Sequence, residues 1–255
     1  MSLMTESPST QKRRIADSAA VALAGLPSVL AVALFGSVAR GDAHEHSDID
    51  LLVLVNATRA HSATLAGQET SPLAHPEISL SIYSEGELEQ RLHQWSRFAA
   101  HLRRESVILH DPHGTLTAIL QTEIPVSIDH EVDVSKRYLT RFAHIDRFGG
   151  RMLFPLAHLY SVGRVAVLAR LSQYGDLEFD QAKAFAKLQR FDPSLADDIQ
   201  MIGSLEPFYD CVRHTDAAVD LPFEPVGSAA ETRTIEAREA VLRVLTSRVV
   251  HDVGT

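Results

Sequence analysis

FGSVARGDAHEHSDIDLLVLV, residues 35–55, joins two apolar runs through a polar segment that begins with Gly36 and Ser37. Residues 29–35 (VLAVALF) form a short apolar run that stops at a glycine, which is typical of a buried strand. Residues 48–55 (DIDLLVLV) are rich in Leu and Val and predict a second strand. The segment therefore predicts two buried strands joined by a sharp turn and a polar loop.

Two aspartates, Asp48 and Asp50, open the second predicted strand with one residue between them. Because side chains alternate along a strand, both carboxylates are expected on one face, while Ile49 and Leu51 point into the core. Two carboxylates this close repel each other unless a cation lies between them. Mg²⁺ prefers oxygen ligands and is commonly held by one or two carboxylates together with substrate phosphates. The pair therefore predicts a Mg²⁺ site.

The turn after the first predicted strand carries a second chemical signal. At Gly36 the backbone can approach a phosphate closely, its exposed N–H groups can bind an anion, and Ser37 adds a hydroxyl donor. Arg40 follows in the same turn, where it can stabilise triphosphate charge or, equally well, pair with a local acid. A phosphate-binding turn beside a metal-binding pair predicts a nucleoside triphosphate site.

The rest of the chain changes character near residue 128. In the first half the pattern predicts helices at 11–26 and 85–104, a half-open strand at 77–83 and an edge strand at 106–111. In the second half it predicts only helices, at 136–148, 152–173, 180–188, 194–203 and 232–248, with a loop at 217–231. We expect a disordered leader (1–10), an α/β domain with a small mixed sheet (11–128) and an all-α helical bundle domain (129–255).

Composition narrows the class of protein. Among 255 residues, 45% are hydrophobic and 22% charged, as in soluble globular proteins, and no apolar run approaches the roughly 20 residues that cross a bilayer. The net charge of -9 argues against a surface built to bind nucleic acid. A lone cysteine, Cys211, excludes an internal disulfide and fits a cytoplasmic location. The sequence leaves a homodimer open.

The stretch GSVARGDAHEHSDIDLLV resembles the Gly-Ser, Arg-Gly and Ser-Asp-X-Asp signature of the polymerase β-type nucleotidyltransferase superfamily. The resemblance covers about 20 residues of the chain and implies a Mg²⁺ ion and a nucleotide bound in a cleft. Carried over onto this sequence, it implies nucleotide contacts from Gly36, Ser37, Arg40 and Ser47. Aminoglycoside and minimal nucleotidyltransferases of this superfamily often have a helical C-terminal domain that supplies part of the acceptor site. Residues 129–255 are similar in kind, although no motif is found there.

One departure from the family concerns its third carboxylate, which lies on a later strand and completes a second metal site. In HPEISLSIYSEGELE (75–89) one family pattern places Ser79 at this position, so that the acid is missing. Another pattern places Glu77 there, and alternation keeps Glu77 on the same face. The alternative for Glu77 is a loop acid after Pro76 without a catalytic role.

The resemblance predicts a Mg²⁺-dependent transferase that moves a nucleoside monophosphate from an NTP, ATP in the first instance, to the hydroxyl group of a small molecule. In this interpretation Asp48, Asp50 and Glu77 bind metal. Three alternatives stay open: a nucleotide-binding protein of antitoxin-like or regulatory type without transferase activity, a toxin-like transferase that acts on tRNA or protein, and a nuclease in the helical half.

Overall fold

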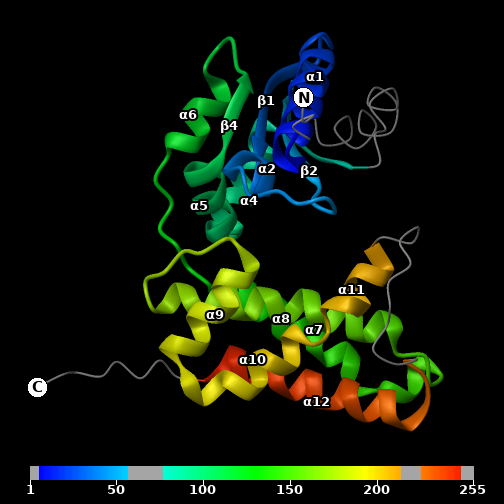
Figure 1. Ribbon diagram of the computed structural model, residues 1–255. Coiled ribbons are helices and arrows are strands. Elements are labelled where there is room, and N and C mark those ends of the chain that lie inside the picture. Colours follow the sequence, from blue (N-terminus) through cyan, green and yellow to red (C-terminus); the bar gives the residue numbers. More distant parts are fainter. Residues whose placement is uncertain (1–5, 57–76, 214–224, 248–255) are drawn as a thin grey trace, which may run out of the picture. The chain divides into compact units, whose positions relative to one another are not determined.

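The computed structural model describes residues 6–56, 77–213 and 225–247, and the chain divides into two compact units, residues 1–127 and 128–255 (Figure 1). The proposed division into domains at 11–128 and 129–255 remains a prediction. Across the described ranges, no helix is both long and apolar enough to span a membrane.

The first unit is built around a four-stranded mixed sheet in the order β3-β2-β1-β4. The strands are β1 (Val29–Phe35), β2 (Ile49–Val55), β3 (Ile78–Ser84) and β4 (Val107–His110). β1 runs antiparallel to β2 and β4, whereas β2 and β3 are parallel. The two central strands are apolar along most of their length because their alternating side chains enter two separate cores, one on each face of the sheet.

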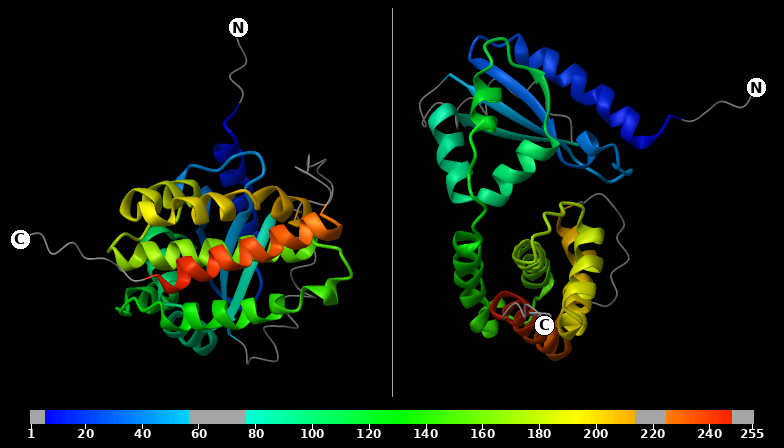
Figure 2. Two further views of the ribbon diagram at one scale, coloured as in Figure 1. Left: turned by 90° about the horizontal axis from the view of Figure 1, so that it is seen from below. Right: turned by 90° about the vertical axis from the view of Figure 1, so that its left-hand side faces the viewer.

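One face of the sheet is covered by α1 (Pro8–Ala24), as Figure 2 shows. The helix begins after Ser7, whose side chain accepts a hydrogen bond from the Thr10 N–H at 3.2 Å. The predicted leader therefore extends too far, because residues 8–10 are helical, and residues 1–5 lie outside the described ranges. The buried stripe of α1 contains these residues: Lys12, Ala16, Ala19, Ala20 and Leu23.

The other face is covered by α4 (Glu85–Gln94), α5 (Ser96–Glu105) and α6 (Thr115–Gln121). The single helix predicted at 85–104 is wrong, because the chain breaks at Trp95, whose backbone angles (φ -121°, ψ 68°) are not helical. The guanidinium carbon of Arg91 lies 4.5 Å from the centre of the Trp95 ring, a cation–π contact at the bend. The two short helices place separate apolar faces against the sheet.

The second unit is helical. Its helices are α7 (Asp129–Thr140), α8 (Leu153–Gln173), α9 (Gln181–Phe191), α10 (Ala196–Gly203), α11 (Glu206–Arg213) and α12 (Gly227–Thr246), with 3-10 turns η2 (Arg141–Ala143), η3 (Ile145–Phe148) and η4 (Pro193–Leu195). α8 is buried on several sides by the other helices. At Gly163 a Cβ atom would lie 2.5 Å from Ile202 Cγ2, so α8 approaches α10 closely only because a glycine stands there. A mixed sheet followed by a helical region confirms the predicted fold class.

Several helix bounds in this unit differ from the sequence-based expectation. The helix expected at 136–148 begins at Asp129 and gives way to η2 and η3 after Thr140, and α11 was not expected. The loop expected at 217–231 is partly helical, because α12 begins at Gly227; its residues 217–224 lie outside the described ranges.

Candidate nucleotide-binding site

The Gly-Ser turn and the aspartate pair meet at the end of the β1–β2 pair. Gly36 opens the short helix α2 (Gly36–Arg40) directly after β1, and the register places Phe35 opposite Asp50. Gly36 has φ +75°, and a Cβ atom there would lie 2.6 Å from Asp50 Oδ2. Two constraints therefore demand glycine: a backbone angle that other residues rarely adopt and a carboxylate packed against its Cα.

Asp48 and Asp50 flank the fully buried Ile49, and both are only partly buried. Asp50 shares its face of β2 with Leu52, which lies in the core under α4–α6. The two aspartates thus stand where a buried strand begins. Two carboxylates beside a glycine cradle are a donor set that fits one Mg²⁺ ion, whose other ligands are ordinarily phosphate oxygens and water.

Ser37 and Ser47 differ in the hydrogen bonds that they form. Ser37 lies in α2 next to Gly36, and its carbonyl accepts a hydrogen bond from the Asp42 N–H at 3.1 Å. Ser47 closes the polar loop, because its hydroxyl accepts from the His44 N–H at 3.0 Å and its own N–H donates to the His44 carbonyl at 3.1 Å. Nucleotide contacts from the two hydroxyl groups stay predictions.

Arg40 forms ion pairs with local acids, one of the two roles that the sequence leaves open. Its Nη1 lies 2.7 Å from Glu105 Oε2, and its Nε lies 3.1 Å from Asp42 Oδ2. Burial lowers the pKa of Arg40, but the hydrogen bonds and charges of Asp42 and Glu105 outweigh burial and raise it above the ordinary value. The guanidinium group therefore ties α2 to α5, and a contact with phosphate would be additional to these pairs.

Glu77 is bound by a lysine. Its Oε2 lies 3.0 Å from the Nζ of Lys12, a side chain of α1 that is only 5% exposed. Ser79, not Glu77, is the register partner of Asp50. Among the described residues, no group of three or more His, Cys, Asp or Glu side chains is placed to hold a metal ion. The structure thus does not gather Asp48, Asp50 and Glu77 into the three-carboxylate group expected from the sequence.

Two residues of this region were missed by the sequence reasoning, Lys12 and His101. Lys12 could have been noticed as a charge on the apolar stripe of α1, at helical spacing from Ala16 and Ala19. The His101 ring lies edge-on to Phe35 at 5.9 Å, and its Nε2 lies 2.9 Å from Glu105 Oε2. The signal for His101 is its i,i+4 spacing to a glutamate.

Burial is the main influence on His101. It lowers the pKa of His101 below the ordinary value, although the nearby Glu105 carboxylate acts in the opposite direction. The side chain therefore favours the neutral form more than a solvated histidine does. Glu105, which is 9% exposed, serves both His101 and Arg40 as a partner.

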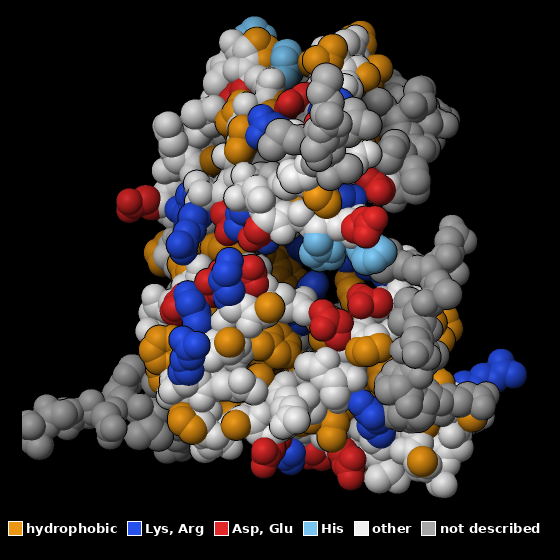
Figure 3. Space-filling view, in the orientation of Figure 1, with side chains coloured by type: hydrophobic (Ala, Val, Ile, Leu, Met, Phe, Trp, Pro, Cys, Tyr) orange, Lys and Arg blue, Asp and Glu red, His pale blue; other side chains and the backbone are white. Residues whose placement is uncertain are grey.

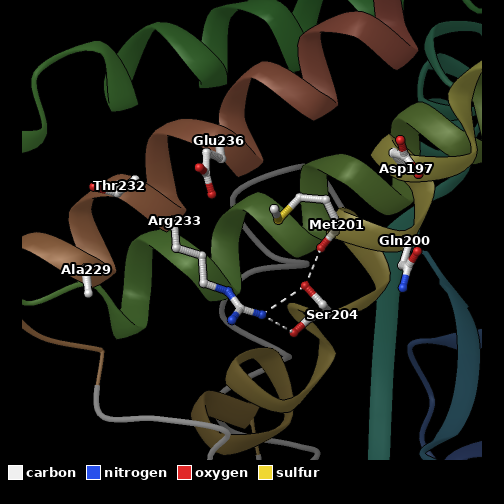
Figure 4. Close-up of a pocket in the computed structure, with 8 residues that line it drawn as sticks. All are labelled: Asp197, Gln200, Met201, Ser204, Ala229, Thr232, Arg233 and Glu236. Carbon is white, nitrogen blue, oxygen red and sulfur yellow. Dashed lines mark hydrogen bonds between the residues drawn. The ribbon is translucent and has the colours of Figure 1, made fainter.

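A groove of about 730 Å³ lies in the helical unit, between α10 and α12 (Figure 4). It is lined by Asp197, Gln200, Met201, Ser204, Ala229, Thr232, Arg233 and Glu236. The Arg233 guanidinium donates to the Ser204 carbonyl at 3.1 Å and to its hydroxyl at 2.9 Å, which joins the two walls. The residues predicted for nucleotide chemistry all belong to the other unit.

Surface charge gives little sign of a nucleic-acid site on the face that Figure 3 shows, where Lys and Arg side chains of the described residues are interspersed with Asp and Glu. Such mixing agrees with the net charge of -9.

Residues 21–110 match the family model described as "Nucleotidyltransferase domain". Among solved structures, the chain is similar to spectinomycin adenyltransferase AAD(9) from Enterococcus faecialis with ATP and spectinomycin, with 13% identity and a TM-score of 0.55 over 92% of this chain and 98% of that chain. It is also similar to a toxin-antitoxin with AMP-PNP, with 18% identity and a TM-score of 0.30 over 51% of this chain and 96% of that one. No curated protein matches the sequence.

Proposed function

From the polymerase β-type nucleotidyltransferase domain that residues 21–110 form, we infer that this chain is a Mg²⁺-dependent transferase. It moves a nucleoside monophosphate from an NTP to a hydroxyl group of a small molecule and releases pyrophosphate. The domain match includes both motifs from which the resemblance was drawn, and it confirms that resemblance.

The observation that carries this proposal is the contact between Gly36 and the Asp50 carboxylate. It brings the turn predicted to bind phosphate and the acid predicted to bind metal to one point at the end of a sheet. A nucleoside triphosphate with Mg²⁺ requires both of these groups side by side. A glycine turn alone, or an aspartate at a strand end alone, is common in proteins that bind no nucleotide. The two in direct contact are harder to explain by structure alone.

In the proposed reaction Asp48 and Asp50 would hold Mg²⁺, which neutralises phosphate charge while the acceptor hydroxyl attacks the α phosphorus. The backbone N–H groups at Gly36 and Ser37 would hold the β and γ phosphates. The ion pairs of Arg40 keep α2, and with it this turn, fixed against α5. The chain's own contribution is thus mainly to position the triphosphate.

ATP is the proposed donor, and a small polyhydroxylated molecule is the proposed acceptor class. The support is the shared fold with an adenyltransferase whose structure contains ATP and spectinomycin. The acidic net charge is in keeping with a small acceptor instead of tRNA. A cytoplasmic location and a homodimer stay predictions.

The test compares Asp50→Asn with Asp17→Asn, an acid on the surface of α1 that pairs with Arg13. Calorimetry with Mg²⁺ and ATP should show at least about a tenfold loss of affinity for Asp50→Asn, equivalent to ~1.4 kcal/mol, and no change for Asp17→Asn. Pyrophosphate release with spectinomycin and other polyhydroxylated molecules reports transfer. Equal Mg–ATP affinity in both variants and the parent would overturn the proposal.

A second candidate is nucleotide binding without transfer, which the Lys12–Glu77 ion pair favours because it occupies the acid that would complete the site. Tight Mg–ATP binding without pyrophosphate release from any acceptor would select it. Release with one acceptor, abolished by Asp50→Asn, would select the transferase.

A further inference from the structure

Lys12 is an unusual residue for its position. It belongs to the apolar stripe of α1 that packs on the sheet, and it is 4% exposed. An ammonium group taken out of water is strongly unfavourable unless a negative partner compensates for the lost hydration. The structure supplies that partner in Glu77, at 3.0 Å.

Glu77 lies next to the aspartate pair in the sheet. β2 and β3 are parallel, with Ile49 opposite Ile78, and Asp48 and Glu77 each precede this register pair by one residue. The Ile49 N–H donates to the Glu77 carbonyl at 2.7 Å, so the backbone at Glu77 is fixed against the start of β2. The lysine therefore brings a positive charge to the predicted metal ligand that directly precedes β3.

β3 offers no carboxylate that could replace Glu77, the acid that Lys12 binds. Ser79 stands opposite Asp50, and a neutral hydroxyl is a far weaker ligand for a divalent ion than a carboxylate. For Glu77 to bind a second metal ion, it would have to leave a buried ammonium group without its negative partner. A metal ion beside Lys12 would also be repelled by its charge.

We propose that Lys12 takes the place of a second metal ion, so that its ammonium group neutralises Glu77 and the domain binds one divalent ion, at Asp48 and Asp50. The inference rests on the proposed function, since it presumes that this end of the sheet binds a metal–nucleotide complex. It assigns Lys12 a role in setting the metal stoichiometry and Glu77 a role as its counter-ion.

The test counts metal ions in the full-length chain. Mn²⁺ is titrated into the protein in the presence of a non-hydrolysable ATP analogue, and free Mn²⁺ is measured by electron paramagnetic resonance. The parent protein should bind one Mn²⁺ per chain. Lys12→Met keeps about the length of the side chain and removes its charge, so Glu77 loses this counter-ion and a second Mn²⁺ should bind. The double variant with Glu77→Gln should return to one.

Each outcome decides the matter. Two Mn²⁺ ions in the parent protein, or one in a folded Lys12→Met variant, would overturn the role of Lys12 and leave the proposed function standing. No Mn²⁺ with any variant would overturn the proposed function itself. If Lys12→Met fails to fold, Glu77→Gln alone is decisive: an unchanged count of one agrees with the proposal, and loss of a metal ion contradicts it.

Discussion

The two units place the ion pairs of their buried and half-buried basic side chains differently. In the first unit, Lys12–Glu77 and Arg40–Glu105 lie at the strand ends and α2, around the candidate site. In the second unit, Arg170 of α8, which is 2% exposed, pairs with Asp192, the residue that follows α9. Ion pairs therefore serve two purposes: in the first unit they border the candidate nucleotide-binding site, and in the second they join helices. Substitutions can test whether this distinction holds.

The largest effect is expected for Arg170→Met in the helical unit. Arg170 lies 3.1 Å from Asp192 and donates to the Ser247 carbonyl at 2.6 Å, so its loss removes the positive partner of a carboxylate that is only 13% exposed and the donor to a half-buried carbonyl. Breaking a buried pair from one side costs about 3–5 kcal/mol. Urea denaturation should show this loss, with Mg–ATP affinity unchanged in the folded protein.

The control for this change is Lys183→Met, because Lys183 is 61% exposed and its pair with Asp180 is worth less than about 1 kcal/mol. If Arg170→Met weakened nucleotide binding while the protein stayed folded, buried charge in the second unit would also serve the site, and the comparison would fail.

Next in size is Gly36→Ala, matched with Gly41→Ala. Both glycines have positive φ, +75° and +82°, but a Cβ atom at Gly36 meets Asp50, whereas at Gly41 no described atom lies within 4 Å. Gly41→Ala should therefore cost about 1 kcal/mol of stability from backbone strain, and Gly36→Ala about 3 kcal/mol. Calorimetry should show that only Gly36→Ala weakens Mg–ATP binding, because only it displaces the carboxylate. Equal effects on binding would remove Gly36 from the site.

The smallest effect is expected for Glu105→Gln, which keeps the shape and removes the charge shared by Arg40 and His101. We expect a loss of about 1–2 kcal/mol. The pKa of His101 should fall further, because Glu105 raises it in the parent protein. A proton NMR titration of the His101 ring would measure this change.

The pH dependence of stability follows from His101. Because the pKa of His101 is lower in the folded than in the unfolded chain, the unfolded chain binds more protons, and stability falls as the pH drops below the ordinary histidine value of about 6.5. Glu105→Gln should steepen this fall, as urea midpoints on the two sides of that pH would reveal. A flatter profile in the variant would contradict the assignment.

The sequence was most informative where local pattern and local structure coincide. β1 occupies the predicted residues 29–35, and the motifs placed Gly36 and Asp50 in one region, because a turn between neighbouring strands keeps them close. Helix ends were less predictable. The break at Trp95 separates two helices that each pack on the sheet, and a local apolar pattern does not show where the chain must bend to allow this.

The partner of Glu77 could not be predicted from local pattern at all. Lys12 and Glu77 are far apart in sequence, and their pairing depends on how α1 lies on the sheet. Helical periodicity places Lys12 on the buried stripe but does not identify an acid on another element. Long-range ion pairs of this kind require the tertiary structure, and here the pair bears directly on which acids are available to a metal.

The β1–β2 pair also has a consequence for the order of assembly. Gly36 and Asp50 meet at the end of β1 and β2, an antiparallel pair of strands that follow each other in the sequence. The outer strands β3 and β4, which pair with β2 and β1, come from later parts of the chain. Closing a short loop costs less conformational entropy than closing a long one. The contact between Gly36 and Asp50 therefore belongs to the strand pair whose closure costs the least conformational entropy, and β3, which Glu77 directly precedes, joins the sheet at a higher cost.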